Sequence, residues 1–236
     1  MLRLLWTVTL AWLGAGLVIL GFPGAAAAAP GANPKREAWR ALFSGKDLTG
    51  WDNGAGRQPG PGWVIKDGAM IRTDRAGTIW TKDRFGDFVL DLEFKTEGNS
   101  GIFIRTGDPP DCVQTGIEIQ VYGPVGKPST HSCGAVYDAQ APTKDAVKAG
   151  QWNQITIKAV KSRIEVVLNG QQIIDVDLDR WSTPGKNPDG TKNKYRKALK
   201  DFPREGHIGF QDHGANVSFR NVKIQVLDKK TAPAAQ

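Results

Sequence analysis

From Trp63 onward, apolar and polar residues alternate in short runs that are separated by turn-forming residues. Residues 88–96, FVLDLEFKT, place Phe, Leu, Leu and Phe at every second position, with Val, Asp, Glu and Lys between them. Because side chains alternate across a strand, this pattern predicts a β-strand with one buried and one solvated face. About a dozen such runs, with almost no helical period between them, predict an all-β fold, an antiparallel β-sandwich or jelly roll.

Two of these runs are interrupted by dipeptides that favour hairpin turns. Asp67 and Gly68 divide WVIKDGAMIR, and Asn169 and Gly170 divide VLNGQQII. Both dipeptides accept the left-handed backbone that a two-residue hairpin turn requires. The sequence therefore predicts hairpins at both places, and helical turns only in EAWRALF (37–43) and KYRKALK (194–200).

Residues 1–29 have the composition of a leader. Arg3 precedes an apolar run from Leu4 to Leu20, and an alanine tract from Ala25 to Ala29 follows. This pattern predicts a cleaved signal peptide, with an uncleaved membrane anchor as the alternative. We expect an exported protein, periplasmic or secreted, with one domain over 38–228 and a disordered tail over 229–236. A membrane is expected as a partner only if the leader is retained.

The formal net charge is +7, and the basic residues are unevenly distributed. Six of them fall in one stretch, KNPDGTKNKYRKALK: Lys186, Lys192, Lys194, Arg196, Lys197 and Lys200. A basic run can bind nucleic acid, but export makes that partner improbable and favours a solvated loop. The two cysteines, Cys112 and Cys133, leave a disulfide open, and neither cysteines nor histidines have zinc-site spacing.

The stretch GIEIQVY (116–122) is apolar on one face and polar on the other. Alternation places Ile117 and Ile119 toward the core and Glu118, Gln120 and Tyr122 on the opposite face, which suits a polar ligand. Sandwich glucanases carry E-x-D-x-x-E on such a strand because double displacement needs two carboxylates. Here an amide and a glycine follow Glu118 instead, so a two-carboxylate glycosidase is poorly supported.

A second polar cluster, GFQDHG, contains Gln211, Asp212 and His213 between glycines. His213 at a strand end is a candidate general base, because an unperturbed histidine titrates near neutral pH. The alternative is a structural turn in which Asp212 caps backbone amides. His131 follows a Pro- and Gly-rich loop of the kind that often carries binding residues, whereas His207 is expected to have a surface role.

Three further residues complete the predicted site. Arg105 alternates with Ile104 and needs a polar partner if it is buried, for which Glu118 on a neighbouring strand is the candidate. Asn99 lies among glycines that allow close backbone approach. The tryptophans of the mature chain are expected in the core, and Trp80, beside the Gly77 turn, is the one with most reason to contact a sugar.

Ordered motifs along the chain resemble the 3-keto-disaccharide hydrolase domain family. They are LFSGKDLTGW, WTKDRFGDFVLDLEFKT, GNSGIFIRT, GIEIQVYG, HSCGAVYD, GQWNQITI, VVLNGQQIID, GHIGFQDHG and FRNVKI, spanning roughly 38–228. The resemblance implies a concanavalin A-like jelly roll in an exported bacterial protein. Cys112 and the lysine-rich stretch are less typical of the family pattern, which leaves the choice of substrate open.

The resemblance also implies hydrolysis of a glycosidic bond in a sugar already oxidised to a ketone at C3. Elimination and hydration of such a sugar need one proton shuttle and one group that stabilises the enolate oxygen. We assign the shuttle to Glu118 or His213 and the stabilising charge to Arg105 or a bound cation. The hydroxyl contacts are assigned to Asn99, Gln120, His131, Gln211 and Trp80.

The sequence requires no cofactor, although carboxylate, amide and carbonyl oxygens would suit Ca²⁺ or Mg²⁺. A noncatalytic carbohydrate-binding module remains the alternative function, because sandwich folds serve both roles. A conventional endoglucanase is the weaker alternative, with Asp91, Glu93 and Asp138 as its spare carboxylates. The sequence does not determine the oligomeric state.

Overall fold

The computed structural model describes residues 38–227, so the predicted leader and tail lie outside the described residues. Nearly every regular element of this range is a β-strand, and every strand pairing is antiparallel. The expected all-β sandwich is therefore confirmed. No helix within residues 38–227 is long and apolar enough to cross a membrane.

The larger sheet has eight strands in the order β11-β10-β9-β6-β13-β4-β3, with β1 paired to β13. Its strands are β1 (Arg40–Ala41), β3 (Trp63–Lys66), β4 (Ala69–Arg72), β6 (Phe88–Thr96), β9 (Asn153–Val160), β10 (Arg163–Leu168), β11 (Gln171–Asp177) and β13 (Val217–Val226). The start of the described chain, expected as a helical turn, is instead strand β1. Its pairing with β13 supplies backbone hydrogen bonds that the local sequence does not reveal.

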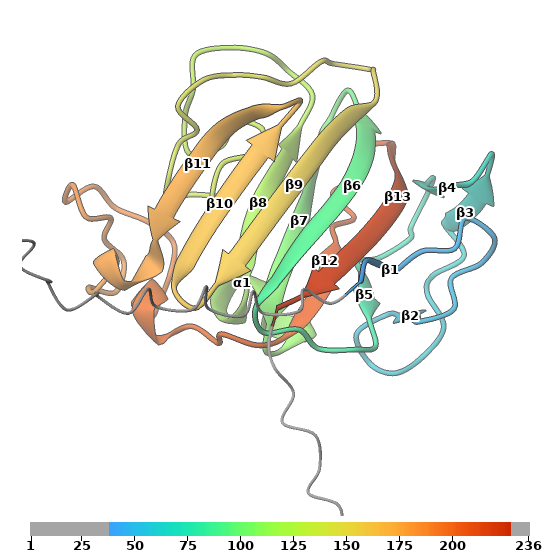
Figure 1. The fold of residues 1–236 in the computed structure, drawn as a ribbon, viewed down its shortest axis with the longest axis horizontal. Coiled ribbons are helices and arrows are strands. Elements are labelled where there is room, and N and C mark those ends of the chain that lie inside the picture. Colours follow the sequence, from blue (N-terminus) through green and yellow to red (C-terminus); the bar gives the residue numbers. More distant parts are fainter. Residues whose placement is uncertain (1–37, 228–236) are drawn as a thin grey trace, which may run out of the picture. The chain divides into compact units, whose positions relative to one another are not determined.

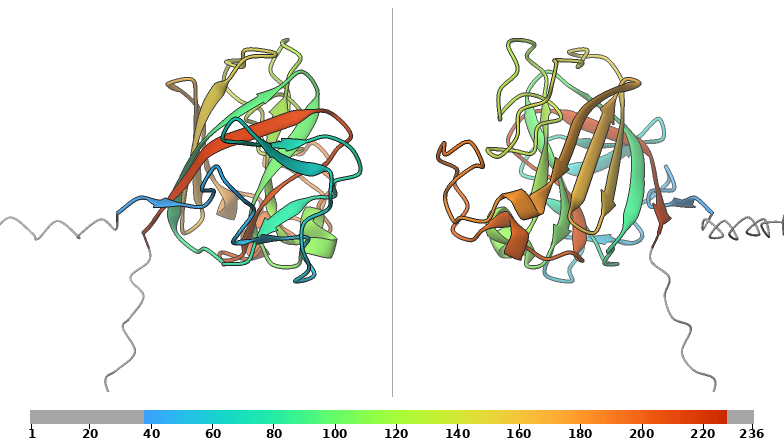
Figure 2. Two further views of the ribbon diagram at one scale, coloured as in Figure 1. Left: turned by 90° about the vertical axis from the view of Figure 1, so that its right-hand side faces the viewer. Right: turned by 60° about the vertical axis from the view of Figure 1, so that its left-hand side comes forward.

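The smaller sheet has five strands in the order β2-β5-β12-β7-β8. They are β2 (Trp51–Asp52), β5 (Ile79–Thr81), β7 (Asn99–Thr106), β8 (Ile117–Tyr122) and β12 (His207–Phe210). Short helical turns connect some strands: η1 (Pro109–Asp111), α1 (Cys112–Thr115), η2 (Leu178–Arg180) and η3 (Leu199–Asp201). Figure 1 shows β9, β6 and β13 in front of β8, β7 and β12, and Figure 2 shows the two layers from the side.

Both predicted hairpins are present. Asp67 and Gly68 join β3 to β4 with φ values of 52° and 72°, and Asn169 and Gly170 join β10 to β11 with φ values of 50° and 77°. Positive φ at both central residues is the requirement of the tightest hairpin turn. The turn residues therefore fixed both connections locally.

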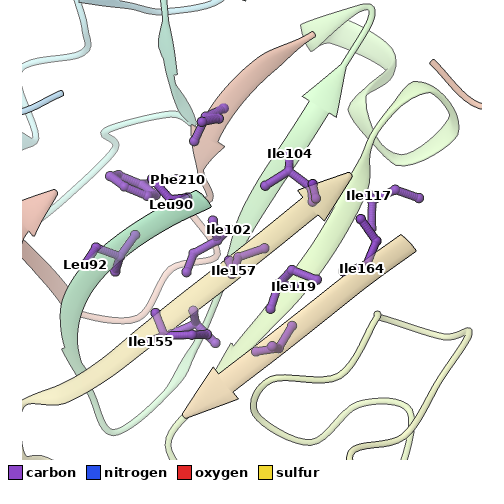
Figure 3. Close-up of a cluster of buried hydrophobic side chains, with 14 of the residues drawn as sticks. Leu90, Leu92, Ile102, Ile104, Ile117, Ile119, Ile155, Ile157, Ile164 and Phe210 are labelled. Carbon is purple, nitrogen blue, oxygen red and sulfur yellow. The ribbon is translucent and has the colours of Figure 1, made fainter. Parts of the chain in front are cut away.

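The core lies between the two sheets. Figure 3 shows side chains of the larger sheet, such as Leu90 and Ile157, facing Ile102 and Ile119 of the smaller one. Phe210 stacks on Phe219 of the opposite sheet at 4.1 Å between ring centroids. Because Ile117, Ile119 and Val121 of β8 all enter this core, the residues between them must face outward. We call that surface of the five-stranded sheet the outer face.

Candidate active site

Strand register places the predicted polar residues in rows across the outer face. Glu118 of β8 lies opposite Phe103 of β7, which pairs with Gly209 of β12, which pairs in turn with Trp80 of β5. In the next row, Gln120 lies opposite Gly101, whose carbonyl accepts a hydrogen bond from the backbone N–H of Gln211. Residues that are distant in sequence therefore meet on one surface.

Glycines make room for two of these side chains. A Cβ at Gly101 would lie 2.4 Å from Glu118 Oε1, and a Cβ at Gly209 would lie 2.4 Å from a ring carbon of Trp80. Both distances are too short for any other residue, because the neighbouring side chains are themselves held by packing. The Glu118 carboxyl thus folds over β7, and the Trp80 ring folds over β12.

Glu118 is a buried carboxyl with weak charge compensation. The residue is only 4% exposed, and the nearest cation, Lys194 Nζ, lies 3.7 Å from Oε2. Burial raises the pKa of Glu118, and the charges of Lys194 and His213 with hydrogen bonds from Gln211 and Lys194 only partly oppose it. Burial also lowers the pKa of Lys194, against the charge of Glu118. The net upward shift suits a carboxyl that exchanges a proton during a reaction.

Lys194 comes from the basic stretch that was expected to be a solvated loop, and that expectation is wrong for this residue. Its backbone N–H donates to Asp138 Oδ2 at 2.7 Å, and its ammonium lies 3.7 Å from the ring centroid of Tyr137. Tyr195 is buried beside it and donates its hydroxyl to the carbonyl of Tyr137 at 2.5 Å. The stretch is therefore pinned over the outer face, although Lys192 and Arg196 on either side are exposed.

Tyr137 reaches the site because its segment runs beside β8. Its backbone N–H donates to the carbonyl of Glu118 at 3.0 Å, and Val136 forms a bridge with Ile119. Val136 is buried in the core, so alternation directs Tyr137 toward the outer face. The same rule, applied to HSCGAVYD as a partner of GIEIQVY, could have identified Tyr137 from the sequence. Nothing local could have identified Lys194, whose position depends on Asp138, a residue 56 positions away.

Two amide side chains present acceptors without partners. Gln120 donates Nε2–H to Asn99 Oδ1 at 3.2 Å, but its Oε1 is buried and accepts no hydrogen bond. The Oε1 atom of Gln211 is likewise buried and unpaired. An unsatisfied buried acceptor is costly and calls for a donor such as a ligand hydroxyl. Both amides lie on the outer face with Glu118.

His131 lines a cavity that adjoins this row. The cavity has a volume of about 390 Å³ and is also lined by Asn99, Gln120 and Tyr137. His131 Nε2 lies 3.4 Å from Asp138 Oδ1, and its ring meets that of Tyr137 edge to face. Three of the five predicted ligand-binding residues therefore share one hollow, which is large enough for a small polar ligand.

The cluster GFQDHG divides into a structural part and an exposed part. Asp212 lies 2.6 Å from Arg72 Nε and accepts the backbone N–H groups of Gly77 and Gly214. Burial raises its pKa, but these hydrogen bonds and the Arg72 charge outweigh that effect, so the net shift is downward. His213 is exposed, and its charge acts on Glu118. Strand β12 ends at Phe210, so the expected alternation does not extend to these residues.

Arg105 does not reach Glu118, and the predicted pairing is wrong. It is 1% exposed and binds Asp87 Oδ1 at 2.9 Å and the carbonyls of Gly86 and Lys161 at 2.8 and 2.5 Å. Its φ of 53° interrupts the strand geometry, and the register of β7 against β12 shifts nearby. The side chain is therefore directed toward connections of the larger sheet, away from the outer face. His207 has a structural contact, Nδ1 to the Thr81 carbonyl at 2.7 Å.

Both cysteines are free, so the disulfide that the sequence left open does not form. Burial raises the pKa of Cys133 to about 12, and burial also raises that of Cys112, which faces the charge of Glu118. Residues 38–227 contain no group of three or more His, Cys, Asp or Glu side chains that could hold a metal ion. The oxygens of Glu118, Gln120 and Gln211 are nevertheless hard ligands of the type that Ca²⁺ or Mg²⁺ uses.

The spare carboxylates named for an endoglucanase are engaged elsewhere. Asp91 accepts from Thr156 at 2.7 Å and Glu93 from Arg220 at 2.6 Å, both on the larger sheet. Asp138 is near the site, but its two oxygens face His131 and the backbone of Lys194. None of the three therefore offers a second free carboxylate opposite Glu118, as two-carboxylate hydrolysis needs.

The chain is similar to known proteins in both sequence and fold. The family model described as "3-keto-alpha-glucoside-1,2-lyase-like domain" matches residues 38–225. A 3-keto-disaccharide hydrolase of Bacteroides thetaiotaomicron is 26% identical over an alignment of 226 residues, and the match covers 79% of this chain and 78% of the relative.

Crystal structures of two Parabacteroides distasonis proteins, provisionally named glycosyl hydrolases, have similar folds. One has a TM-score of 0.73 and 34% identity, covering 80% of this chain and all of the other. The second has a TM-score of 0.67 and 26% identity, covering 80% and 94% of the two chains.

Proposed function

The chain belongs to the 3-keto-alpha-glucoside-1,2-lyase-like domain family, and we propose that it hydrolyses the glycosidic bond of 3-keto-disaccharides or 3-keto-glucosides. The observation that carries this proposal is Glu118, a buried carboxyl whose pKa burial raises, while the spare carboxylate nearest to it, Asp138, is engaged by His131 and by the backbone of Lys194. A two-carboxylate mechanism lacks one of its groups here. A mechanism with a single proton shuttle needs only one such group, which Glu118 supplies.

The proposed chemistry starts from the acidity that a C3 ketone confers on the C2 hydrogen. The Glu118 carboxylate takes the C2 proton, and the C2–H electron pair forms an enolate with its charge on the C3 oxygen. The enolate expels the oxygen at C1, which leaves as an alcohol after gaining a proton, and a C1–C2 double bond remains. Water then adds its oxygen to C1 while C2 regains a proton. One water is consumed, and Glu118 returns to its starting state.

Lys194 takes the electrostatic role that the sequence analysis assigned to Arg105 or to a cation. Its ammonium is 3.7 Å from Glu118 Oε2 and is held over the Tyr137 ring. A fixed positive charge there favours the ionised base and stabilises the negative charge that develops on the enolate oxygen. A divalent cation remains a prediction that a chelator would test, with loss of turnover as its expected result.

We assign the binding of the sugar's ring hydroxyls to the two side-chain amides whose acceptor oxygens have no partner. Gln120 and Gln211 each offer a buried acceptor oxygen that a sugar hydroxyl would satisfy. Asn99 and His131 complete the lining of the adjoining cavity. The leader pattern supports a periplasmic or secreted location, where oxidised sugars from outside the cell would be available.

The test compares a 3-keto-disaccharide with the same unmodified disaccharide, using purified protein. We expect release of reducing sugar from the ketosugar only. In deuterated water, the released 3-ketoglucose should carry deuterium at C2, because that position loses its proton and regains one from solvent. Release without C2 label would contradict the elimination route. Binding of both sugars with turnover of neither would identify a carbohydrate-binding module.

A further inference from the structure

A second cavity opens on the outer face, toward the edge of the five-stranded sheet that is opposite β8. Its volume is about 430 Å³, and it lies at β5, three strands from β8 in the sheet order. At the usual strand spacing this separation is roughly 14 Å. Its lining residues are Asn53, Gly54, Ala55, Gln58, Gly60, Arg75, Ala76, Gly77, Thr78, Trp80, Pro109 and Pro110. A ligand that reaches both Glu118 and this cavity must be longer than one sugar ring.

Trp80 differs from the other buried tryptophans in its hydrogen bonding. The indole N–H groups of Trp51, Trp63 and Trp181 donate to Leu42 O, Gly77 O and Asn187 Oδ1, at 2.8, 2.7 and 2.9 Å. Trp80 is 2% exposed and no residue in the described part of the chain accepts from its Nε1, but this atom is not one of the fully enclosed polar atoms that lack a partner, so solvent reaches it. An indole N–H that its own protein leaves without an acceptor takes one from water or from a ligand. A ligand oxygen in the cavity would supply it.

The polar groups around Trp80 include donors that the described part of the chain leaves unpaired. Asn53 uses its Oδ1 to accept the backbone N–H groups of Ala55 and Arg57, at 3.0 and 3.2 Å, and its Nδ2 donates to no described residue. Arg75 makes no ion pair or hydrogen bond with any described residue. No carboxylate is among the lining residues. Unpaired donors at a cavity favour a ligand with acceptor oxygens, and a guanidinium favours a carboxylate.

The backbone of Arg75 supports the same assignment. Its φ is 45°, in the left-handed region that residues other than glycine, asparagine and aspartate seldom occupy. This conformation places an arginine at the cavity in the turn before β5, two residues before Gly77. Strained positions of this kind cluster at ligand sites, because the surrounding structure must hold them.

We propose that this cavity binds a sugar ring that carries a carboxylate, a uronic acid, with Arg75 facing the carboxylate and Trp80 Nε1 and Asn53 Nδ2 facing ring oxygens. This assignment rests on the proposed function: the ring is the leaving-group half of a substrate whose ketosugar half lies at Glu118. The site thereby extends the substrate class from neutral 3-keto-disaccharides to 3-keto-glucosides of uronic acids.

Binding is tested first, independently of turnover. Methyl β-glucuronide and methyl β-glucoside are titrated into the full protein and followed by tryptophan fluorescence and calorimetry. We expect the glucuronide to bind at least tenfold tighter, and Arg75→Gln to remove that preference. Trp80→Phe, which keeps a ring but loses the N–H, should weaken both ligands severalfold. Arg57→Gln, at an exposed arginine that lies in the loop contributing Asn53 and Gln58 but does not itself line the cavity, is the control.

Turnover then separates this proposal from the proposed function. A 3-keto-glucosyl glucuronide and a 3-keto-glucosyl glucose are compared, and Arg75→Gln should raise KM for the acidic substrate alone. Equal affinity for both glycosides, or an unchanged preference in Arg75→Gln, would overturn the uronate site even if ketosugars are hydrolysed. Conversely, Arg75-dependent glucuronide binding without turnover of any ketosugar would overturn the hydrolase and leave the binding site standing.

Discussion

Glu118 and Asp212 are two poorly exposed carboxylates associated with the same five-stranded sheet, and their environments differ in kind. Asp212 has Arg72 at 2.6 Å and two backbone N–H donors, and its pKa is lowered despite burial. Glu118 has its nearest cation at 3.7 Å, and burial raises its pKa. One carboxylate has its charge satisfied inside the fold, whereas the other does not.

This difference separates a structural carboxylate from a chemical one. Full pairing keeps Asp212 ionised and fixed, so it links the turn before β5 to the chain after β12, as the cap interpretation of GFQDHG anticipated. Incomplete pairing leaves Glu118 able to change its protonation state. The sequence named Glu118 as a candidate base and Asp212 as a possible cap of backbone amides, and their neighbours in the structure give each its electrostatic environment.

The largest expected effect is on turnover in Glu118→Gln. Removing a proton-transfer group should lower kcat for a 3-keto-disaccharide by roughly 10²- to 10⁴-fold, while the similar shape of glutamine preserves the fold. Steady-state release of reducing sugar measures the rate, and circular dichroism checks the fold. Glu205→Gln, at an exposed glutamate, is the matched control and should keep wild-type activity.

His213→Ala distinguishes the two candidate bases of the sequence analysis. Because His213 is exposed and acts on Glu118 through its charge, we expect a loss of no more than about tenfold. A loss in His213→Ala that equals or exceeds that in Glu118→Gln would transfer the role of base to the histidine.

The next effect is on stability in Asp212→Asn. Arg72 and Asp212 side chains are 8% and 13% exposed, and removing one partner of such a pair typically costs about 3 to 5 kcal/mol. Urea denaturation measures the free energy of unfolding. Asp83→Asn breaks an exposed pair with Arg40, whose side chains are 61% and 52% exposed, and should cost under about 1 kcal/mol. Equal losses in both variants would remove the distinction drawn here.

Lys194→Met should change the pH dependence of turnover. The Lys194 charge lowers the pKa of Glu118 against the effect of burial, so its removal should shift the acidic limb of the kcat/KM profile to higher pH. We expect activity at neutral pH to fall about tenfold, or roughly 1.4 kcal/mol of barrier. Lys192→Met, at an exposed lysine of the same loop, is the control. An acidic limb that stays in place would mean that Lys194 does not act on the base.

The smallest expected effect is on the pH dependence of stability, for which Glu118 and Asp212 should contribute slopes of opposite sign. The folded-state pKa of Glu118 is raised, so its contribution is present below the ordinary value of 4.5 and is lost as pH rises through the folded pKa. The folded-state pKa of Asp212 is lowered, so its contribution is present above 3.8 and is lost as pH falls through the folded pKa. Unfolding curves from pH 3 to 8, for wild type against Glu118→Gln and Asp212→Asn, should diverge in opposite directions.

Local pattern predicted those parts of the fold and site that depend on alternation and turns. The face of β8 that carries Glu118 and Gln120 followed from GIEIQVY, because Ile117 and Ile119 had to enter the core. The hairpins at Asp67–Gly68 and Asn169–Gly170 followed from their turn residues. The same rule of alternation failed to place Arg105, because its positive φ directs the side chain away from Glu118.

The sequence by itself determined that this chain forms an antiparallel sandwich with a polar outer face, because a period of two and turn chemistry act over a few residues. Only the tertiary structure decided which charges surround Glu118. It joined the backbone N–H of Lys194 to the carboxylate of Asp138, paired Asp212 with Arg72, and directed Arg105 to Asp87. Charge compensation depends on distances between segments far apart in the chain, and no local pattern encodes those distances.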